Sequence, residues 1–136
     1  MNIWPYRSGY EYVTEEDWVL ETDISPPRPL KTDFIEMAAG GKMTLKKYYA
    51  WNGPSGPTIK TKTAVRATAF HDAFYQLCRM GMLPAYYRKK ADILMYDILI
   101  NAGMNRIRAW LWLKMVRAFA SKAAKVGTEP PVLYAP

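Results

Sequence analysis

The segment "AFHDAFYQLCRMGMLPAYYRKKADILMY", residues 69–96, decides the fold. It contains two amphipathic stretches joined by the loop "GMLP", residues 81–84. So short a connection makes the two predicted helices antiparallel neighbours. Residues equally far from the loop then lie level with each other, and His71 and Asp92 form such a pair if both face inward. The spacing alone therefore predicts that the only histidine of the chain contacts a carboxylate.

Three helices are predicted around this loop: Ala64–Met80, a second from Pro84 to Gly103, and a third over about Asn105–Lys125. Thr63 is a suitable N-cap for the first helix and Gly81 a suitable stop. Each helix carries an apolar stripe with helical spacing. The stripes, in chain order, are Ala67, Phe70, Phe74, Leu77 and Cys78; Tyr87, Ala91, Leu94, Met95, Ile98 and Ala102; and Ala109, Trp112, Val116, Phe119, Ala120 and Ala123.

The first fifty residues are predicted to form antiparallel β structure. The stretch "YEYVTEEDWVLET", residues 10–22, mixes aromatic and β-branched residues with acids. In residues 31–51, two further runs flank Gly40-Gly41, a pair that favours a tight hairpin turn. Three prolines make "SPPRPL", residues 25–30, a loop. The Gly/Pro-rich "WNGPSGPT", residues 51–58, is a structured turn.

The chain of 136 residues is predicted to be one α+β domain. Residues 1–57 supply the β section and the Gly/Pro loop, residues 58–127 the three helices, and residues 128–136 an extended tail. Half of the residues are hydrophobic, with five Trp and ten Tyr, which excludes a disordered chain. The single cysteine, Cys78, excludes an internal disulfide framework, so packing must hold the fold together.

The net charge of +7 is unevenly distributed. Residues 1–57 hold six Lys/Arg against eight Asp/Glu, and residues 58–136 hold thirteen against four. This basic half indicates an anionic partner, namely phospholipid headgroups, an acidic protein or nucleic acid, unless it is only a solvated helix surface. Arg106, Lys114 and Arg117, with Lys125 beyond them, form a candidate anionic-surface site on one side of the third helix. Trp110 shares this side, and either a membrane interface, an acidic surface or packing against the β half explains it.

Several classes of protein are not favoured. Zinc-ligand spacings, a Walker loop and recognition motifs are absent from the sequence, so nucleic-acid binding has only the charge in its favour. The N-terminal "MNIWPYRSGY" shows neither a basic leader nor an apolar core, so we expect no signal peptide and synthesis in the cytosol. No apolar run reaches the length of a membrane span, so no transmembrane segment is expected.

A histidine level with a carboxylate is the arrangement that a general base needs. The carboxylate accepts one ring N–H and fixes the tautomer, which leaves the other nitrogen free to take a proton from water. Asp72 lies about 100° further round the helix and points toward the "WNGPSG" turn. Its carboxylate and the carbonyls of that turn are oxygen ligands of the kind that calcium prefers.

Plainer interpretations stand beside these. His71 is also explained as a buried histidine whose hydrogen bonding a neighbouring carboxylate satisfies. Asp72 is also explained as an anchor that accepts backbone N–H groups of the turn. The turn itself is then no more than a corner between strand and helix.

The motif "HD", with Tyr75 four residues after His71 and Asp92 twenty-one residues after it, resembles the active-site helices of the phospholipase A(2) superfamily. It looks most like the small bacterial and fungal branch. The segment from Asp92 to Tyr96 is similar to the family's "D-x-x-x-Y", and "AWLWLKMVRAF", residues 109–119, is similar to its closing helix.

The chain resembles still more closely an uncharacterised family from tailed bacteriophages and prophages. The shared segments are "WNGPSGPT", "HDAFYQL" with Arg79, "RKKAD" and "NAGM", which together with the β half span roughly residues 9–122. This likeness implies a phage- or prophage-encoded protein that works in the host cytoplasm or the virion.

The resemblance implies a role for each matching residue. His71 is the catalytic base and Asp92 orients it. Asp72 binds calcium with the loop from Trp51 to Ser55, in which Asn52, Gly53 and Ser55 are the candidate ligands. Calcium polarises an ester carbonyl and stabilises the oxyanion. Tyr75 and Tyr96 brace the carboxylates.

Two departures from the phospholipase pattern bear on activity. The small bacterial enzymes have an aspartate where this chain has Asn52, which weakens the case for calcium. The disulfides of the secreted enzymes are absent. Two functions follow as hypotheses: a calcium-dependent hydrolase of phospholipid or another ester, or a non-catalytic phage accessory protein that keeps the scaffold and binds a virion component or a host protein.

Overall fold

The computed structural model describes residues 4–6, 12–51, 62–119 and 133–135. These residues form an α+β fold in which antiparallel strands precede three helices, as the sequence predicts. The main sheet has the order β3-β6-β5-β4, and every neighbouring pair is antiparallel. Its strands are β3 (Trp18–Glu21), β4 (Leu30–Lys31), β5 (Ile35–Met37) and β6 (Lys42–Leu45).

The hairpin between β5 and β6 turns at the predicted glycine pair. Met37 pairs with Met43, and Ile35 with Leu45. Gly41 has a φ of +100°, and a Cβ at this position would lie 2.2 Å from the carbonyl oxygen of Thr22. Both the backbone conformation and the close approach therefore require glycine here. Residues 22–29 form no strand, as the prolines predict, although Leu30 at the end of the predicted loop already begins β4.

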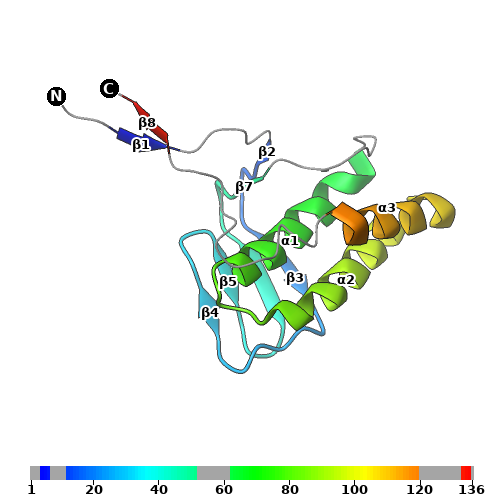
Figure 1. The fold of residues 1–136 in the computed structure, drawn as a ribbon, viewed down its shortest axis with the longest axis horizontal. Coiled ribbons are helices and arrows are strands. Elements are labelled where there is room, and N and C mark those ends of the chain that lie inside the picture. The colour runs from blue at the N-terminus through cyan, green and yellow to red at the C-terminus, as the bar shows by residue number, and fades with distance from the viewer. Residues whose placement is uncertain (1–3, 7–11, 52–61, 120–132, 136) are drawn as a thin grey trace.

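Two short ladders join distant parts of the chain. Strand β2 (Tyr12–Val13) pairs with β7 (Ala50–Trp51), and β1 (Trp4–Tyr6) pairs with β8 (Leu133–Ala135). The extended tail of the prediction thus contains a strand. Figure 1 shows β1 and β8 side by side, close to the two ends of the sequence.

The helices are α1 (Lys62–Arg79), α2 (Arg88–Asn101) and α3 (Arg106–Phe119), and the 3-10 turn η1 (Ala85–Tyr87) precedes α2. The prediction of three helices is confirmed, with shifted ends. Because α1 begins at Lys62, Thr63 lies in its first turn and does not precede it. Residues 120–125 of the predicted third helix, with Ala120 and Ala123, lie outside the described residues.

Helix α1 ends where glycine permits a left-handed residue. Gly81 has a φ of +72°. The N–H of Met82 donates to the carbonyl of Leu77 (3.0 Å), and the N–H of Gly81 to that of Cys78 (3.0 Å). This double hydrogen bond satisfies carbonyls that the helix end leaves without partners. It turns the chain sharply, so α2 runs back along α1 as the short loop predicts.

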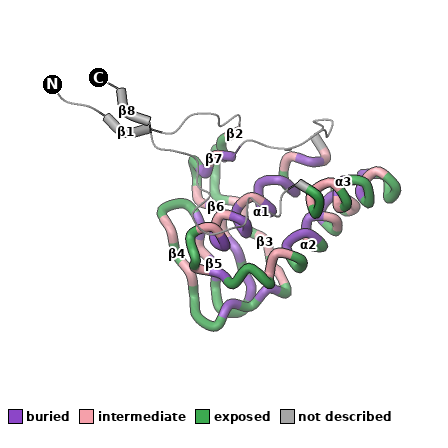
Figure 2. Tube along the Cα trace, in the orientation of Figure 1, coloured by how far each residue is buried: buried purple, intermediate pink, exposed green. Residues whose placement is uncertain are grey.

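A single hydrophobic core joins the sheet to the helices. Figure 2 shows buried positions along α1 and α2, and on the strands they alternate in β5 and β6. The predicted stripe of α1 is buried throughout. The α2 stripe is partly wrong, because Ala102 lies beyond the last helical residue and is exposed, whereas Leu99 is fully buried.

None of the described helices is both long enough and apolar enough to cross a bilayer.

Candidate active site

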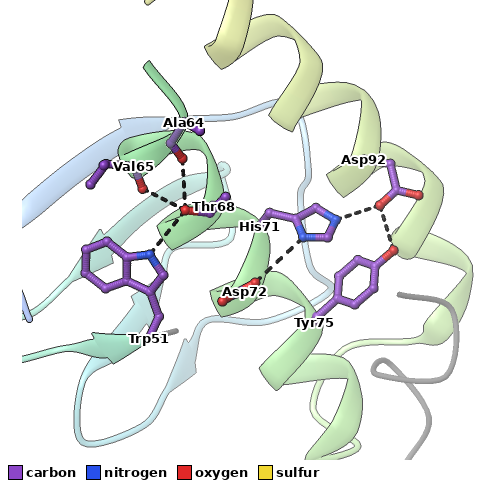
Figure 3. Close-up of polar contacts among 8 residues, drawn as sticks. All are labelled: Trp51, Ala64, Val65, Thr68, His71, Asp72, Tyr75 and Asp92. Carbon is purple, nitrogen blue, oxygen red and sulfur yellow. Dashed lines mark hydrogen bonds and ion pairs between the residues drawn. The ribbon is translucent and has the colours of Figure 1, made fainter. Parts of the chain in front are cut away.

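His71 and Asp92 meet between α1 and α2. The ring Nε2 of His71 lies 2.7 Å from Asp92 Oδ1 (Figure 3). An ionised carboxylate only accepts hydrogen bonds, so Nε2 carries the proton and donates it. His71 is 6% exposed and Asp92 is fully buried. The contact that the helix spacing predicts is therefore formed inside the core.

Tyr75 is the second donor to this carboxylate. Its hydroxyl donates to the same Oδ1 over 2.6 Å, and its ring centroid lies 4.1 Å from that of His71. Tyr75 is one helical turn after His71, so both residues reach Asp92 from the same face of α1. The role expected for Tyr75, to brace a carboxylate, agrees with this geometry.

The other carboxylate oxygen has weaker support. Asp92 Oδ2 is buried without a hydrogen-bond partner among the described residues. Arg117 on α3 lies within ion-pair range of it, with its Nε 3.7 Å away. Three helices thus converge on one carboxylate: α1 through two hydrogen bonds, α2 through the aspartate itself, and α3 through a partly exposed guanidinium.

The second ring nitrogen of His71 faces Asp72. The distance from Nδ1 to Asp72 Oδ1 is 3.9 Å, which is an ion-pair contact and too long for a hydrogen bond. The Asp72 side chain is about a third exposed, whereas Asp92 is sealed. The imidazole therefore has one nitrogen bound to Asp92 in the core and one directed toward the partly exposed Asp72 (Figure 3).

These neighbours set the protonation of the imidazole. Burial has the largest single effect and lowers the pKa of His71, but the carboxylates of Asp72 and Asp92 together outweigh it, so the pKa lies above its ordinary value. Burial, reinforced by the hydrogen bond to Asp92, raises the pKa of Tyr75 and keeps its hydroxyl a donor. The site therefore favours a positive ring between two carboxylates.

The described residues supply few calcium ligands. Asn52, Gly53 and Ser55 lie outside them. Within the described part of the chain, no group of three or more His, Cys, Asp and Glu side chains converges as a metal site. Asp72 alone falls short of the six to eight oxygens that calcium takes, so a calcium site would depend on the loop.

The remaining candidates lie around the site. Trp51 is buried, and its Nε1–H donates to Thr68 Oγ1 on α1 (3.2 Å), so it fixes the start of the loop against this helix. Tyr96 forms no hydrogen bond with the carboxylates of Asp72 and Asp92, although both lie in the described part of the chain. It lines a cavity of about 420 Å³ with Asp97, Ile100, Asn101 and Arg106.

The predicted basic side of α3 is divided by the structure. Arg106, Lys114 and Arg117 are all exposed, but only Arg117 of the three also comes within ion-pair range of Asp92. The sequence contained a signal for this contact. The midpoint of Asp92 and Arg117 falls between Met104 and Asn105, inside the loop that joins α2 to α3, so the rule that pairs His71 with Asp92 across one loop also pairs Asp92 with Arg117 across the next.

Comparison with known proteins adds no relative: no family model, no curated protein and no solved structure matches this chain.

Proposed function

We propose that this chain is a phage- or prophage-encoded protein similar to phospholipase A(2) and that it is a calcium-dependent hydrolase of a phospholipid or another ester. The observation that carries the proposal is the asymmetric imidazole of His71. Its Nε2 lies 2.7 Å from the buried carboxylate of Asp92, and its Nδ1 faces the partly exposed carboxylate of Asp72. A general base requires one fixed and one available nitrogen.

The dyad would act on water. In its neutral form, His71 takes a proton at Nδ1 from a water molecule, and the hydroxyl attacks the ester carbonyl. Asp92 stabilises the imidazolium through Nε2, while the hydroxyl of Tyr75 holds the carboxylate in place. The proton then passes from Nδ1 to the departing alcohol. Calcium, if held by Asp72 and the loop, would supply positive charge for the oxyanion.

The raised pKa of His71 bears on this chemistry. A protonated imidazole is not a base, so activity would rise with pH as the ring loses its proton. A cation at Asp72 would offset that carboxylate and return the pKa toward its ordinary value.

The test is release of fatty acid from mixed phosphatidylcholine and phosphatidylglycerol vesicles during a calcium titration. We expect His71→Asn to abolish release and Asp72→Asn to remove its dependence on calcium. The matched control is Asp97→Asn, an exposed carboxylate on α2, which should leave release unchanged. Circular dichroism establishes that each variant is folded. Release that persists in a folded His71→Asn protein would refute the proposed base.

A second function is favoured by the burial of the site. His71 is only 6% exposed, and the proton on its Nε2 is fully engaged. This suits a non-catalytic phage accessory protein in which the dyad is structural and the surface binds a virion component or a host protein. Such a protein does not bind calcium, so we expect its melting temperature to be the same in calcium and in chelator. The hydrolase melts at a higher temperature in calcium.

The setting proposed for either function is the host cytoplasm or the virion. The partner proposed for the basic half is an anionic phospholipid or an acidic protein surface. Both proposals rest on the resemblance and on the excess of Lys/Arg over Asp/Glu in residues 58–136.

A further inference from the structure

The solvent side of α3 carries a ridge of three apolar side chains and one lysine. We call this surface the outer face, and it consists of Ile107, Trp110, Leu111 and Lys114. The three apolar side chains are 73%, 50% and 49% exposed. On a helix with 3.6 residues per turn, these four positions form one stripe. It lies opposite Ala109 and Trp112, which are buried in the core. The outer face is therefore the side of α3 that is turned away from the described core.

The ridge is surrounded by positive charge. Helix α3 contains Arg106, Arg108, Lys114 and Arg117 and no acidic residue. The ammonium of Lys114 lies over the ring of Trp110, with its Nζ 5.2 Å from the ring centroid. Figure 1 shows α3 at the opposite end of the molecule from β4, so the ridge is at the periphery. A patch of this kind combines apolar contact with attraction for an anion.

We propose that the outer face of α3 seats the protein on an anionic phospholipid bilayer. A helix lying in a membrane interface buries Trp and aliphatic side chains among the acyl chains while Lys and Arg meet the headgroups. Trp and Lys side by side suit the boundary between these layers. The single convex ridge needs no complementary groove, because lipids rearrange around it.

Other anionic partners fit this surface less well. Nucleic acid is held by Lys and Arg on phosphates and by aromatic stacking, and it offers nothing to Ile107 and Leu111 at the centre of the ridge. An acidic protein would need a groove shaped to the helix. Neither partner would make the chain bind to anionic vesicles in a way that depends on both Lys114 and the aliphatic side chains.

This inference takes its partner from the proposed function but needs no catalysis. The same helix reaches inward, since Arg117 lies 3.7 Å from Asp92. A bilayer on the outer face would therefore lie against the helix that also contacts the dyad. Binding can be measured in chelator, where the proposed hydrolysis is absent, and with the His71→Asn variant as well as the natural chain.

The experiment is sedimentation of the full chain with vesicles of phosphatidylcholine alone or with about a third phosphatidylglycerol. We expect the natural chain to bind only the anionic vesicles, and Ile107→Asn/Leu111→Asn to weaken that binding about tenfold or more. The matched control is Val13→Asn/Val19→Asn, because these valines are also about half exposed, at 49% and 54%, but lie on strands. It should bind as the natural chain does.

A second pair of variants tests the charge. Lys114→Glu should weaken binding to anionic vesicles, and Lys42→Glu, the same change on β6, should not. The proposal would be overturned if the control variants lost as much binding as the α3 variants. It would also be overturned if Lys114→Glu weakened binding and Ile107→Asn/Leu111→Asn did not. Binding that survives in His71→Asn while fatty-acid release is lost separates this inference from the hydrolase. Binding without release in the natural chain would count against the hydrolase alone.

Discussion

At the scale of single residues, His71 determines how this site responds to pH. The groups that face it are Asp72, Asp92 and Tyr75, with Arg117 beyond the second carboxylate. Its pKa is raised in the folded protein, so the folded state holds the proton more tightly than the unfolded chain does. The stabilisation is therefore fully present below the unfolded pKa of about 6.5 and is lost as pH rises through the folded value.

We therefore predict that the free energy of unfolding falls as pH rises from about 6 into the alkaline range. One proton limits the slope to about 1.4 kcal/mol per pH unit. Urea unfolding at a series of pH values measures it. His71→Asn should flatten the profile, although it also lowers stability at every pH. A profile that keeps its slope in this variant would assign the titration to another group.

Tyr75→Phe tests the second donor to Asp92. The change removes the hydroxyl bonded to Oδ1 at 2.6 Å and keeps the ring in the core. Removal of one hydrogen-bond donor from a buried carboxylate should lower the free energy of unfolding by about 1–3 kcal/mol. The control is Tyr48→Phe, because that tyrosine is 58% exposed and its change should be nearly neutral. Chemical denaturation compares the two; equal effects would mean that the hydrogen bond contributes no net stability.

At the scale of elements, the β5–β6 hairpin depends on one glycine of its pair. Gly41→Ala introduces a Cβ 2.2 Å from a backbone oxygen at a φ of +100°, whereas the same change at Gly40 meets nothing within 4 Å. Left-handed strain alone costs about 1–3 kcal/mol, and the clash adds to it. We expect thermal unfolding to show a marked loss for Gly41→Ala and little change for Gly40→Ala. Similar melting temperatures would contradict the turn geometry.

The helices show how far spacing carries a prediction. Short turns at Gly81 and Gly103 make α1, α2 and α3 antiparallel in sequence, which brings His71, Asp92 and Arg117 level. The ends were less predictable. A 3-10 turn precedes α2. The buried face of α2 includes Leu99, because α2 packs against both α1 and α3 and these contacts decide which of its residues face the core.

At the scale of the whole molecule, the β section and the helices share one core. Ile35 on β5 and Leu77 on α1 are both fully buried in it. We predict that Ile35→Ala and Leu77→Ala each lower the free energy of unfolding by about 2–5 kcal/mol. Each should shift the midpoint of one unfolding transition that the strands and helices share. Far-UV circular dichroism reports the helices, and tryptophan fluorescence in a Trp110→Phe/Trp112→Phe background reports the strands, which hold the remaining tryptophans. Separate midpoints for the two signals would show that the halves unfold independently.

The amino-acid sequence by itself determined the order of strands and helices, the turn at Gly40-Gly41 and the contact between His71 and Asp92. Each depends on local rules, namely the helical period, turn chemistry and the length of one loop. Only the tertiary structure decided that β1 pairs with β8, that Trp51 donates to Thr68 and that Asp92 Oδ2 has no hydrogen-bond donor among the described residues. Each of these features depends on residues far apart in the chain. It is therefore decided by the packing of the entire core and not by a local sequence pattern.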